Sequence, residues 1–299
     1  MLYKNMMNSN KVLNGHGRSF ASFGEIVQGR SGDDTDFLAT LPINLWSYCD
    51  LTAIEINGPL IVEAKEGFLK SKLLVEMILK RIGIQEGYYI TVEINSEIPV
   101  GKGLSSSSAD MLAALRATQH LFGFLVSSEH ISYLFHEIEP HDALHFDSSV
   151  LYDHRKGCLI NDYKYIPEYT IIYVDTGGTI DTINYNKSIN YNKEIIKNYE
   201  KIVANLNEAF INKDDSAIAM NATESFMLHI RANNDKRLEY NEFLKNISAI
   251  GVQATHSGTC VGFLFKSKTD KSILDYAENM IEKKYKKTSR IVRTLKLID

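Results

Sequence analysis

A loop rich in glycine and serine contains the residues of this chain that are best suited to chemistry on phosphate. The loop contains Pro99, Gly101, Lys102, Gly103, Leu104, Ser105, Ser106, Ser107 and Ser108. Glycines let a backbone approach a ligand closely, and the first turn of a helix offers unpaired N–H groups to an anion. Serine hydroxyls add donors, and one of them could also ligate Mg²⁺. The residue types and their spacing therefore predict a phosphate-binding loop.

The segments on either side of this loop predict the elements that position it. Residues 88–94 alternate in polarity and are rich in β-branched and aromatic side chains, which is typical of a strand. Residues 109–117 are strong helix formers. A flexible linker is the alternative for a glycine–serine run, but a position directly between a strand and a helix argues against it. The loop has neither the Gly-Lys-Ser/Thr of a Walker A motif nor the third glycine of a dinucleotide fingerprint.

An acid and an amide, Glu25 and Gln28, lie between Gly24 and Gly29. Beside a binding cleft, a carboxylate and an amide could hold the hydroxyl or ammonium group of a small polar substrate. A bend in a strand explains the two glycines equally well.

Residues 137–147 are dense in glutamate, aspartate and histidine. One interpretation is a transition-metal site with His141, His145 and Asp147 as ligands, although no HExxH pattern is present. A second is a phosphoryl-transfer site, in which one carboxylate holds Mg²⁺ and another orients or deprotonates an acceptor hydroxyl. A third is that most of the histidines are surface or capping residues without a chemical role.

A further combination of glycine with polar groups occurs at His256, Ser257 and Gly258. Backbone of this kind can face a phosphate or a carboxylate, and a plain hairpin turn is the alternative. The residues lie within 251–265, which is typical of two strands joined by a tight turn.

Length and composition exclude several classes of protein. The 299 residues carry a formal net charge of −4, which gives no electrostatic argument for a nucleic-acid partner. No apolar run approaches the ~18 residues of a membrane span, and the first residues lack a signal peptide. The three cysteines are far apart in apolar surroundings, so they are expected to be reduced core residues. A cytoplasmic protein is predicted.

The remaining pattern predicts a chain of one or two domains that mixes strands and helices. Strands are expected at 37–42, 49–56 and 169–174, with a turn at 57–59. Helices are expected at 69–81, 128–137, 193–211, 214–229 and 236–249. The Asn- and Met-rich start is expected to be a loose tail, and a domain break is expected within 165–185.

Together these segments resemble the GHMP kinase superfamily. Residues 99–109 are similar to its central PxGxGLxSS motif, which is highly specific. Within the superfamily the resemblance is greatest to the L-threonine kinases of cobalamin biosynthesis. Residues 24–29, 139–142, 174–178 and 256–259 carry this narrower resemblance, which spans about residues 18 to 265.

The resemblance implies an α/β (α+β) fold: a tail at 1–17, an ATP-binding domain like ribosomal protein S5 domain 2 at 18–168, and a ferredoxin-like domain at 169–299. ATP and Mg²⁺ are the implied cofactors, and the loop 99–108 would hold the phosphates. Ser107 and Glu139 would ligate the metal ion, Asp142 would orient or deprotonate the acceptor, and Lys102 would neutralise phosphate charge. The implied substrate-binding residues are Glu25, Gln28, His141, Thr176, Gly177, His256, Ser257 and Gly258.

Two residues depart from the pattern of the threonine kinases. Those enzymes have Glu-Pro-Thr-Asp-Ser where this chain has His141 in place of threonine and Ala143 in place of serine. A site that loses a hydroxyl can change specificity strongly. The resemblance thus implies a kinase for the side-chain hydroxyl of an amino acid, with L-threonine as the first candidate. L-serine, L-homoserine or an amino alcohol remains open as acceptor, as does a non-catalytic nucleotide-binding regulator. The expected partners are the acceptor and ATP, and a homodimer is left open.

Overall fold

The computed structural model describes residues 11–177, 192–232, 234–255 and 258–296. Contacts divide the chain into two compact units that are interleaved along the sequence. The first unit comprises Met1–Ala21, Leu45–Ile98 and Ser106–His145, and the second comprises Ser22–Asn44, Pro99–Ser105 and Phe146–Asp299. Two long strands, β1 (Val12–Arg30) and β2 (Asp36–Pro59), contribute residues to both units.

The sheet of the first unit forms around the second half of β2. This part of β2 pairs antiparallel with β4 (Glu86–Ser96), from Ser47 opposite Ser96 onward, and also pairs with β1. A short strand, β3 (Ile61–Ala64), pairs parallel with β4. The sheet order in this unit is therefore β3-β4-β2-β1.

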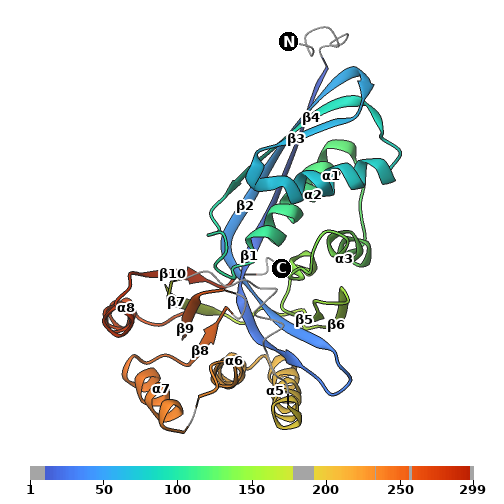
Figure 1. The fold of residues 1–299 in the computed structure, drawn as a ribbon. Coiled ribbons are helices and arrows are strands. Elements are labelled where there is room, and N and C mark those ends of the chain that lie inside the picture. Colours follow the sequence, from blue (N-terminus) through green and yellow to red (C-terminus); the bar gives the residue numbers. More distant parts are fainter. Residues whose placement is uncertain (1–10, 178–191, 233, 256–257, 297–299) are drawn as a thin grey trace. The chain divides into compact units, whose positions relative to one another are not determined.

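Helices cover one face of this sheet. They are α1 (Leu69–Arg81), which a 3-10 turn at Glu66–Phe68 precedes, and α2 (Ser106–Phe122), while α3 (Ser128–His136) follows α2 in the chain (Figure 1). Alternate residues of β2 and β4 form the core with the helices: Cys49, Leu51, Ala53, Ile90 and Val92 pack with Val75, Leu79, Ala113, Ala114 and Ala117. The intervening residues of β2, Tyr48 and Asp50, are exposed, as the two-residue period of a strand requires. The opposite face of the sheet therefore remains accessible.

The second unit contains a four-stranded antiparallel sheet in the order β10-β7-β9-β8. The strands are β7 (Tyr169–Asp175), β8 (Gly251–Ala254), β9 (Cys260–Lys266) and β10 (Ser289–Arg293). The helices are α5 (Lys193–Ile211), α6 (Asp215–His229), α7 (Asn234–Asn246) and α8 (Lys271–Tyr285). The core includes Ile172 and Phe263 from the sheet, with Phe226 and Ala277 from the helices.

A hairpin completes the second unit. Strand β5 (Val150–Asp153) follows the 3-10 turn Leu144–Phe146 and pairs with both β6 (Cys158–Asp162) and the first residues of β2. The ring of Phe37, on this part of β2, lies 6.3 Å from that of Tyr199 on α5. The hairpin thus belongs to the same unit as α5.

The predicted mixed α/β fold is confirmed, and the bounds of α1 are those predicted from its periodicity. The two strands expected at 37–42 and 49–56 are one strand, β2, and the expected turn at 57–59 is an irregularity at its end, where the register with β4 shifts. Strand β1 already begins at Val12, within the segment 1–17 that the sequence assigns to a tail. The domain boundary between 168 and 169 stays a prediction.

Cysteine burial differs from the expectation at one position. Cys49 and Cys260 are buried, but Cys158 is exposed, because β6 faces solvent along most of its length. No helix in the described part of the chain is both long and apolar enough to cross a membrane.

Candidate active site

The glycine loop occupies backbone conformations that its sequence favours. Gly101 and Gly103 have φ angles of 71° and 74°, and Ser105, the residue before α2, has a φ of 62°. A left-handed serine is strained, and such strain is concentrated at functional sites. The N–H groups of the first turn of α2 follow directly in the chain, which is the arrangement predicted for an anion-binding loop.

Part of the loop lies against the connection between β8 and β9. A Cβ atom at Gly103 would be 2.6 Å from Cβ of Thr255, and one at Gly258 would be 2.1 Å from the carbonyl oxygen of Lys102. Both distances are too short for any side chain. The two segments therefore need glycine at Gly103 and Gly258 for their close approach.

Gly103→Ala is expected to lower the free energy of unfolding more than Gly101→Ala. Both positions have positive φ, which costs about 1–2 kcal/mol for an alanine. Gly101 has open space around it, so this cost is expected to be its whole effect, whereas Gly103 also meets Thr255. Urea unfolding of the two variants measures the difference. Equal losses would show that the contact with Thr255 does not constrain the loop.

Lys102 forms an ion pair with Asp175 at the end of β7, with 2.7 Å between Nζ and Oδ2. The other carboxylate oxygen of Asp175 accepts hydrogen bonds from Thr259 Oγ1 at 2.5 Å and from the Gly177 amide at 2.9 Å. Burial raises the pKa of Asp175, but the hydrogen bonds from Lys102, Thr259 and Gly177 outweigh it and lower the pKa to about 2. The loop lysine is thus held beside a permanently ionised carboxylate.

Ser107, on the first turn of α2, donates a short hydrogen bond to the carboxylate of Glu139. The other oxygen of Glu139 forms an ion pair with Lys70, near the start of α1. The two residues predicted as Mg²⁺ ligands are therefore in direct contact. A carboxylate and a hydroxyl are oxygen donors of the kind that Mg²⁺ prefers, so this pair fits the ion.

The neighbouring serine holds the predicted catalytic aspartate. The backbone N–H of Asp142 donates to Ser108 Oγ at 3.2 Å, and Ser108 is buried whereas Asp142 is half-buried. Consecutive serines of α2 therefore bond two residues of one short segment, Glu139 and Asp142. This arrangement brings a metal-binding carboxylate and a candidate acceptor-orienting carboxylate to the first turn of one helix.

His141 and His145 form a buried cluster against α3. The ring nitrogens of His141 lie 3.2 Å from the Ser132 carbonyl and 3.4 Å from the Asp142 carbonyl, and His145 Nε2 shares a hydrogen bond of 2.8 Å with Ser132 Oγ. Burial lowers the pKa of His141 to about 4 and, together with the nearby His141, lowers that of His145 to about 3. The interpretation of these histidines as surface residues is wrong for both.

The alternative of a transition-metal site at His141, His145 and Asp147 is also wrong. The described residues contain no group of three or more His, Cys, Asp or Glu side chains that could hold a metal ion. The Nε2 atoms of both histidines are directed at Ser132, and Asp147 is exposed. The second interpretation, in which carboxylates do the chemistry, stays a prediction.

Asp110 is a buried carboxylate on α2 that sequence reasoning left without a role. It is 8% exposed and accepts a hydrogen bond of 2.5 Å from Ser47 Oγ on β2. Burial raises its pKa, and the hydroxyls of Ser47 and Ser96 partly offset that effect. Asp110 thereby links the helix that follows the loop to two strands of the sheet.

Asp110→Ala is expected to lower the free energy of unfolding by about 1–3 kcal/mol, since it leaves the hydroxyls of Ser47 and Ser96 without their acceptor. Asp110→Asn keeps an acceptor oxygen and removes the buried charge, so its loss should be smaller. Urea unfolding at pH 7 compares the two variants. Wild-type stability of the alanine variant would contradict the linking role.

The other predicted substrate residues lie in the second unit. Glu25 and Gln28 on β1 are 4% and 7% exposed, and Gln28 Oε1 has no hydrogen-bond partner among the described residues. Thr176 donates to the Thr259 carbonyl at 2.8 Å, and Gly177 and Gly258 belong to the contacts given above. His256 and Ser257 lie outside the described residues.

Sequence reasoning missed Lys70, Asp175 and Asp110. Lys70 is an ordinary helical lysine in the sequence, and no local signal pairs it with Glu139. Asp175 ends a buried strand, which is a recognisable position for a functional carboxylate. Asp110 is a charged residue in an otherwise apolar helix, and this pattern could have identified it.

Comparison with known protein sequences adds three findings. Residues 69–149 match the family of GHMP kinase N-terminal domains. The L-threonine kinase of Citrobacter freundii is 24% identical over 277 residues, which cover 88% of this chain and 90% of that protein. The L-threonine kinase of Salmonella typhimurium LT2 is 27% identical over 262 residues, which cover 83% and 82%.

Among solved structures, homoserine kinase from Cytophaga hutchinsonii superimposes with a TM-score of 0.67 at 15% identity, over 99% of this chain and 97% of that chain. At this identity the likeness shows a common fold. The resemblance found in the motifs of the sequence therefore extends to the fold and to most of the chain's length.

Proposed function

Since the chain belongs to the GHMP kinase superfamily, we propose that it transfers the γ-phosphate of ATP to the side-chain hydroxyl of an amino acid, with L-threonine as acceptor. One observation carries the proposal. Ser107 and Ser108, which follow the glycine loop, hydrogen-bond to Glu139 and Asp142, so that the proposed metal-binding and acceptor-orienting residues are both bonded to the first turn of α2.

In this proposal the loop 99–108 binds the phosphates of ATP. Its left-handed residues and the start of α2 supply backbone N–H groups, and Lys102 supplies a positive charge. Asp175 would release this lysine when a phosphate replaces it as partner. Catalysis then depends on positioning and charge neutralisation, because phosphoryl transfer needs little covalent help from the protein.

Ser107 and Glu139 would hold Mg²⁺, which would neutralise charge on the phosphate oxygens. Lys70 orients Glu139 through its ion pair. Asp142 orients the acceptor hydroxyl or accepts its proton. The hydroxyl oxygen forms a bond to the γ-phosphorus, the bond to the bridging oxygen of the β-phosphate breaks, and ADP leaves.

The acceptor is proposed to contact Glu25, Gln28, Thr176, Gly177, His256, Ser257 and Gly258. The unpartnered oxygen of Gln28 supports a role in binding, since buried polar atoms rarely lack a partner. His141 is better suited to holding its segment than to contacting the acceptor, because it is 3% exposed and both ring nitrogens face backbone carbonyls. A cytoplasmic enzyme with a role in cobalamin biosynthesis belongs to the same proposal, through the motif resemblance.

The experiment is an assay of ADP release from Mg-ATP with L-threonine, L-serine, L-homoserine and small amino alcohols. Preference for L-threonine is expected. Preference for another alcohol would support the kinase activity but assign a different acceptor. The change from Thr-Asp-Ser to His141-Asp142-Ala143 would then explain the difference. Nucleotide binding without turnover of any acceptor would instead indicate a regulator and contradict the proposal.

A further inference from the structure

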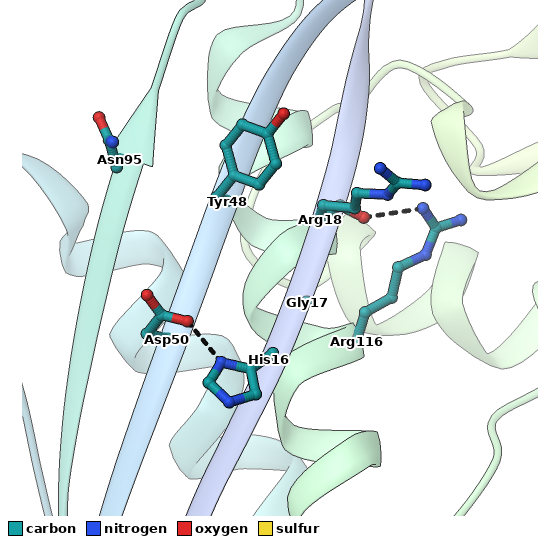
Figure 2. Close-up of a pocket in the computed structure, with 7 residues that line it drawn as sticks. All are labelled: His16, Gly17, Arg18, Tyr48, Asp50, Asn95 and Arg116. Atoms are coloured by element: carbon teal, nitrogen blue, oxygen red, sulfur yellow. Dashed lines mark hydrogen bonds and ion pairs between the residues drawn. The ribbon is translucent and has the colours of Figure 1, made fainter.

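A pocket open to solvent, called the cavity below, lies in the first unit, on the sheet face opposite α1 and α2. Its volume is about 790 Å³, and it is lined by His16, Gly17, Arg18, Tyr48, Asp50, Asn95 and Arg116 (Figure 2). None of these residues belongs to the proposed active site. The volume falls within the ~300–1,000 Å³ that is usual for sites of small molecules.

Two arginines supply positive charge to this cavity. Arg116 reaches it from α2 and donates to the Arg18 carbonyl oxygen at 2.9 Å, and the Arg18 guanidinium lies 4.7 Å from the centre of the Trp46 ring. Both side chains are therefore held in place by a protein contact. Less conformational entropy is lost when such groups bind a ligand.

The carboxylate in the cavity already has a hydrogen-bond partner. Asp50 is the one carboxylate among the lining residues, and its Oδ1 lies 2.6 Å from His16 Nδ1. Within the described ranges, no carboxylate forms an ion pair with Arg18. The lining residues therefore include two arginines and one carboxylate, in a chain whose formal net charge is −4. Two arginines in one cavity favour a doubly charged anion with oxygen acceptors.

The remaining lining groups suit an organic part attached to that anion. Tyr48 and Asn95 lie directly opposite each other on β2 and β4, and Tyr48 is 39% exposed. Tyr48 offers a flat ring and a phenol beside Arg18, and Asn95 offers an amide on the far side of Tyr48 (Figure 2). Aromatic and amide groups of this kind orient small ligands through contact and hydrogen bonds.

We propose that this cavity is a second, non-catalytic site for a small phosphomonoester. Arg18 and Arg116 bind the phosphate, and Tyr48 and Asn95 contact the organic part. The site is distinct from the loop 99–108 in sequence and in the residues it uses, and it does not depend on the proposed kinase activity.

Isothermal titration calorimetry tests the proposal with AMP, O-phospho-L-threonine and inorganic phosphate as probes. The protein is first saturated with Mg²⁺ and a non-hydrolysable ATP analogue, so that the proposed nucleotide site is filled. Arg18→Gln and Arg116→Gln are each expected to weaken phosphomonoester binding by about tenfold, the loss of one charge-assisted contact. Arg81→Gln is the matched control, because Arg81 lies in the same unit and pairs with Glu137.

The site is supported if both cavity variants bind the phosphomonoester more weakly and Arg81→Gln binds it as tightly as wild type. A phosphomonoester must also bind more tightly than inorganic phosphate, and whichever of AMP and O-phospho-L-threonine binds more tightly identifies the class of organic part. Equal affinity for inorganic phosphate, or unchanged affinity in both cavity variants, overturns the proposal. Arg18→Lys, which keeps the charge, should retain more affinity than Arg18→Gln if the variants remain folded. The readout is equilibrium binding, so it stands whether or not the chain turns over ATP.

Discussion

Asp142→Asn is expected to lower kcat by about 10²–10⁴-fold, the usual contribution of a positioned acid–base group. The amide cannot accept the proton of the acceptor hydroxyl and orients it less strongly than a carboxylate. Affinity for ATP should change little, because the proposed phosphate contacts come from residues 99–108 and from Ser107 with Glu139. Steady-state kinetics with the preferred acceptor and equilibrium binding of ATP give both quantities.

Ser108→Ala is the matched variant for this prediction. It removes the acceptor of the Asp142 N–H but keeps the carboxylate, so its effect on kcat should be much smaller than that of Asp142→Asn. Turnover that is unchanged in Asp142→Asn would contradict the assigned role. Equal losses in the two variants would mean that Asp142 matters through its backbone position and not through its carboxylate.

Acid is expected to destabilise the protein through the buried histidine cluster. In the unfolded chain a histidine has a pKa near 6.5, whereas burial lowers the pKa of His145 to about 3 in the folded chain. Between these values the unfolded chain takes up a proton that the folded chain does not. The stabilisation is complete above pH 6.5 and falls as the pH decreases, by about 3 kcal/mol at pH 4 if His145 acts alone.

His145→Gln is expected to remove about half of the combined loss from the two histidines, because His141, whose pKa burial lowers to about 4, still contributes. Urea unfolding between pH 7 and pH 4 measures it. His130→Gln is the control, since His130 is exposed on α3. Asp175 contributes little to the loss in this pH range. Its ion pair and hydrogen bonds outweigh its burial and lower its pKa to about 2, so the stability that it provides is lost at lower pH, below the usual pKa of an aspartate. An identical pH dependence in wild type and His145→Gln would contradict the account.

The elements that could be predicted from the sequence are those with local signals. The periodicity of residues 69–81 gave the bounds of α1, and the glycine–serine motif identified the loop and the start of α2. The length of β2 was missed because Asn57-Gly58-Pro59 is a strong turn signal, while the pairing with β4 that keeps the strand extended is not local. The first residues of β1 were missed for a similar reason: Glu55 N donates to the Lys11 carbonyl far along the chain.

In the candidate site, too, residues within local motifs could be predicted and contacts between distant segments could not. Ser107, Glu139 and Asp142 could be proposed from the sequence because short motifs contain them. The structure shows Ser107 bonded to Glu139 and Ser108 bonded to Asp142, and the roles of these residues stay predictions. Lys70 is 69 residues from Glu139, and their ion pair depends on how α1 packs beside α2. The burial of His141 and His145 depends on α3, so a dense run of polar residues could not reveal it.

The most direct measurement follows the phosphoryl group from [γ-³²P]ATP to L-threonine, with the product separated and identified. O-phospho-L-threonine formed in equal amount to ADP, and greatly reduced in Asp142→Asn, is the predicted result. Bound ATP with no labelled product from L-threonine or from any other small alcohol would contradict the central claim that this chain is a kinase.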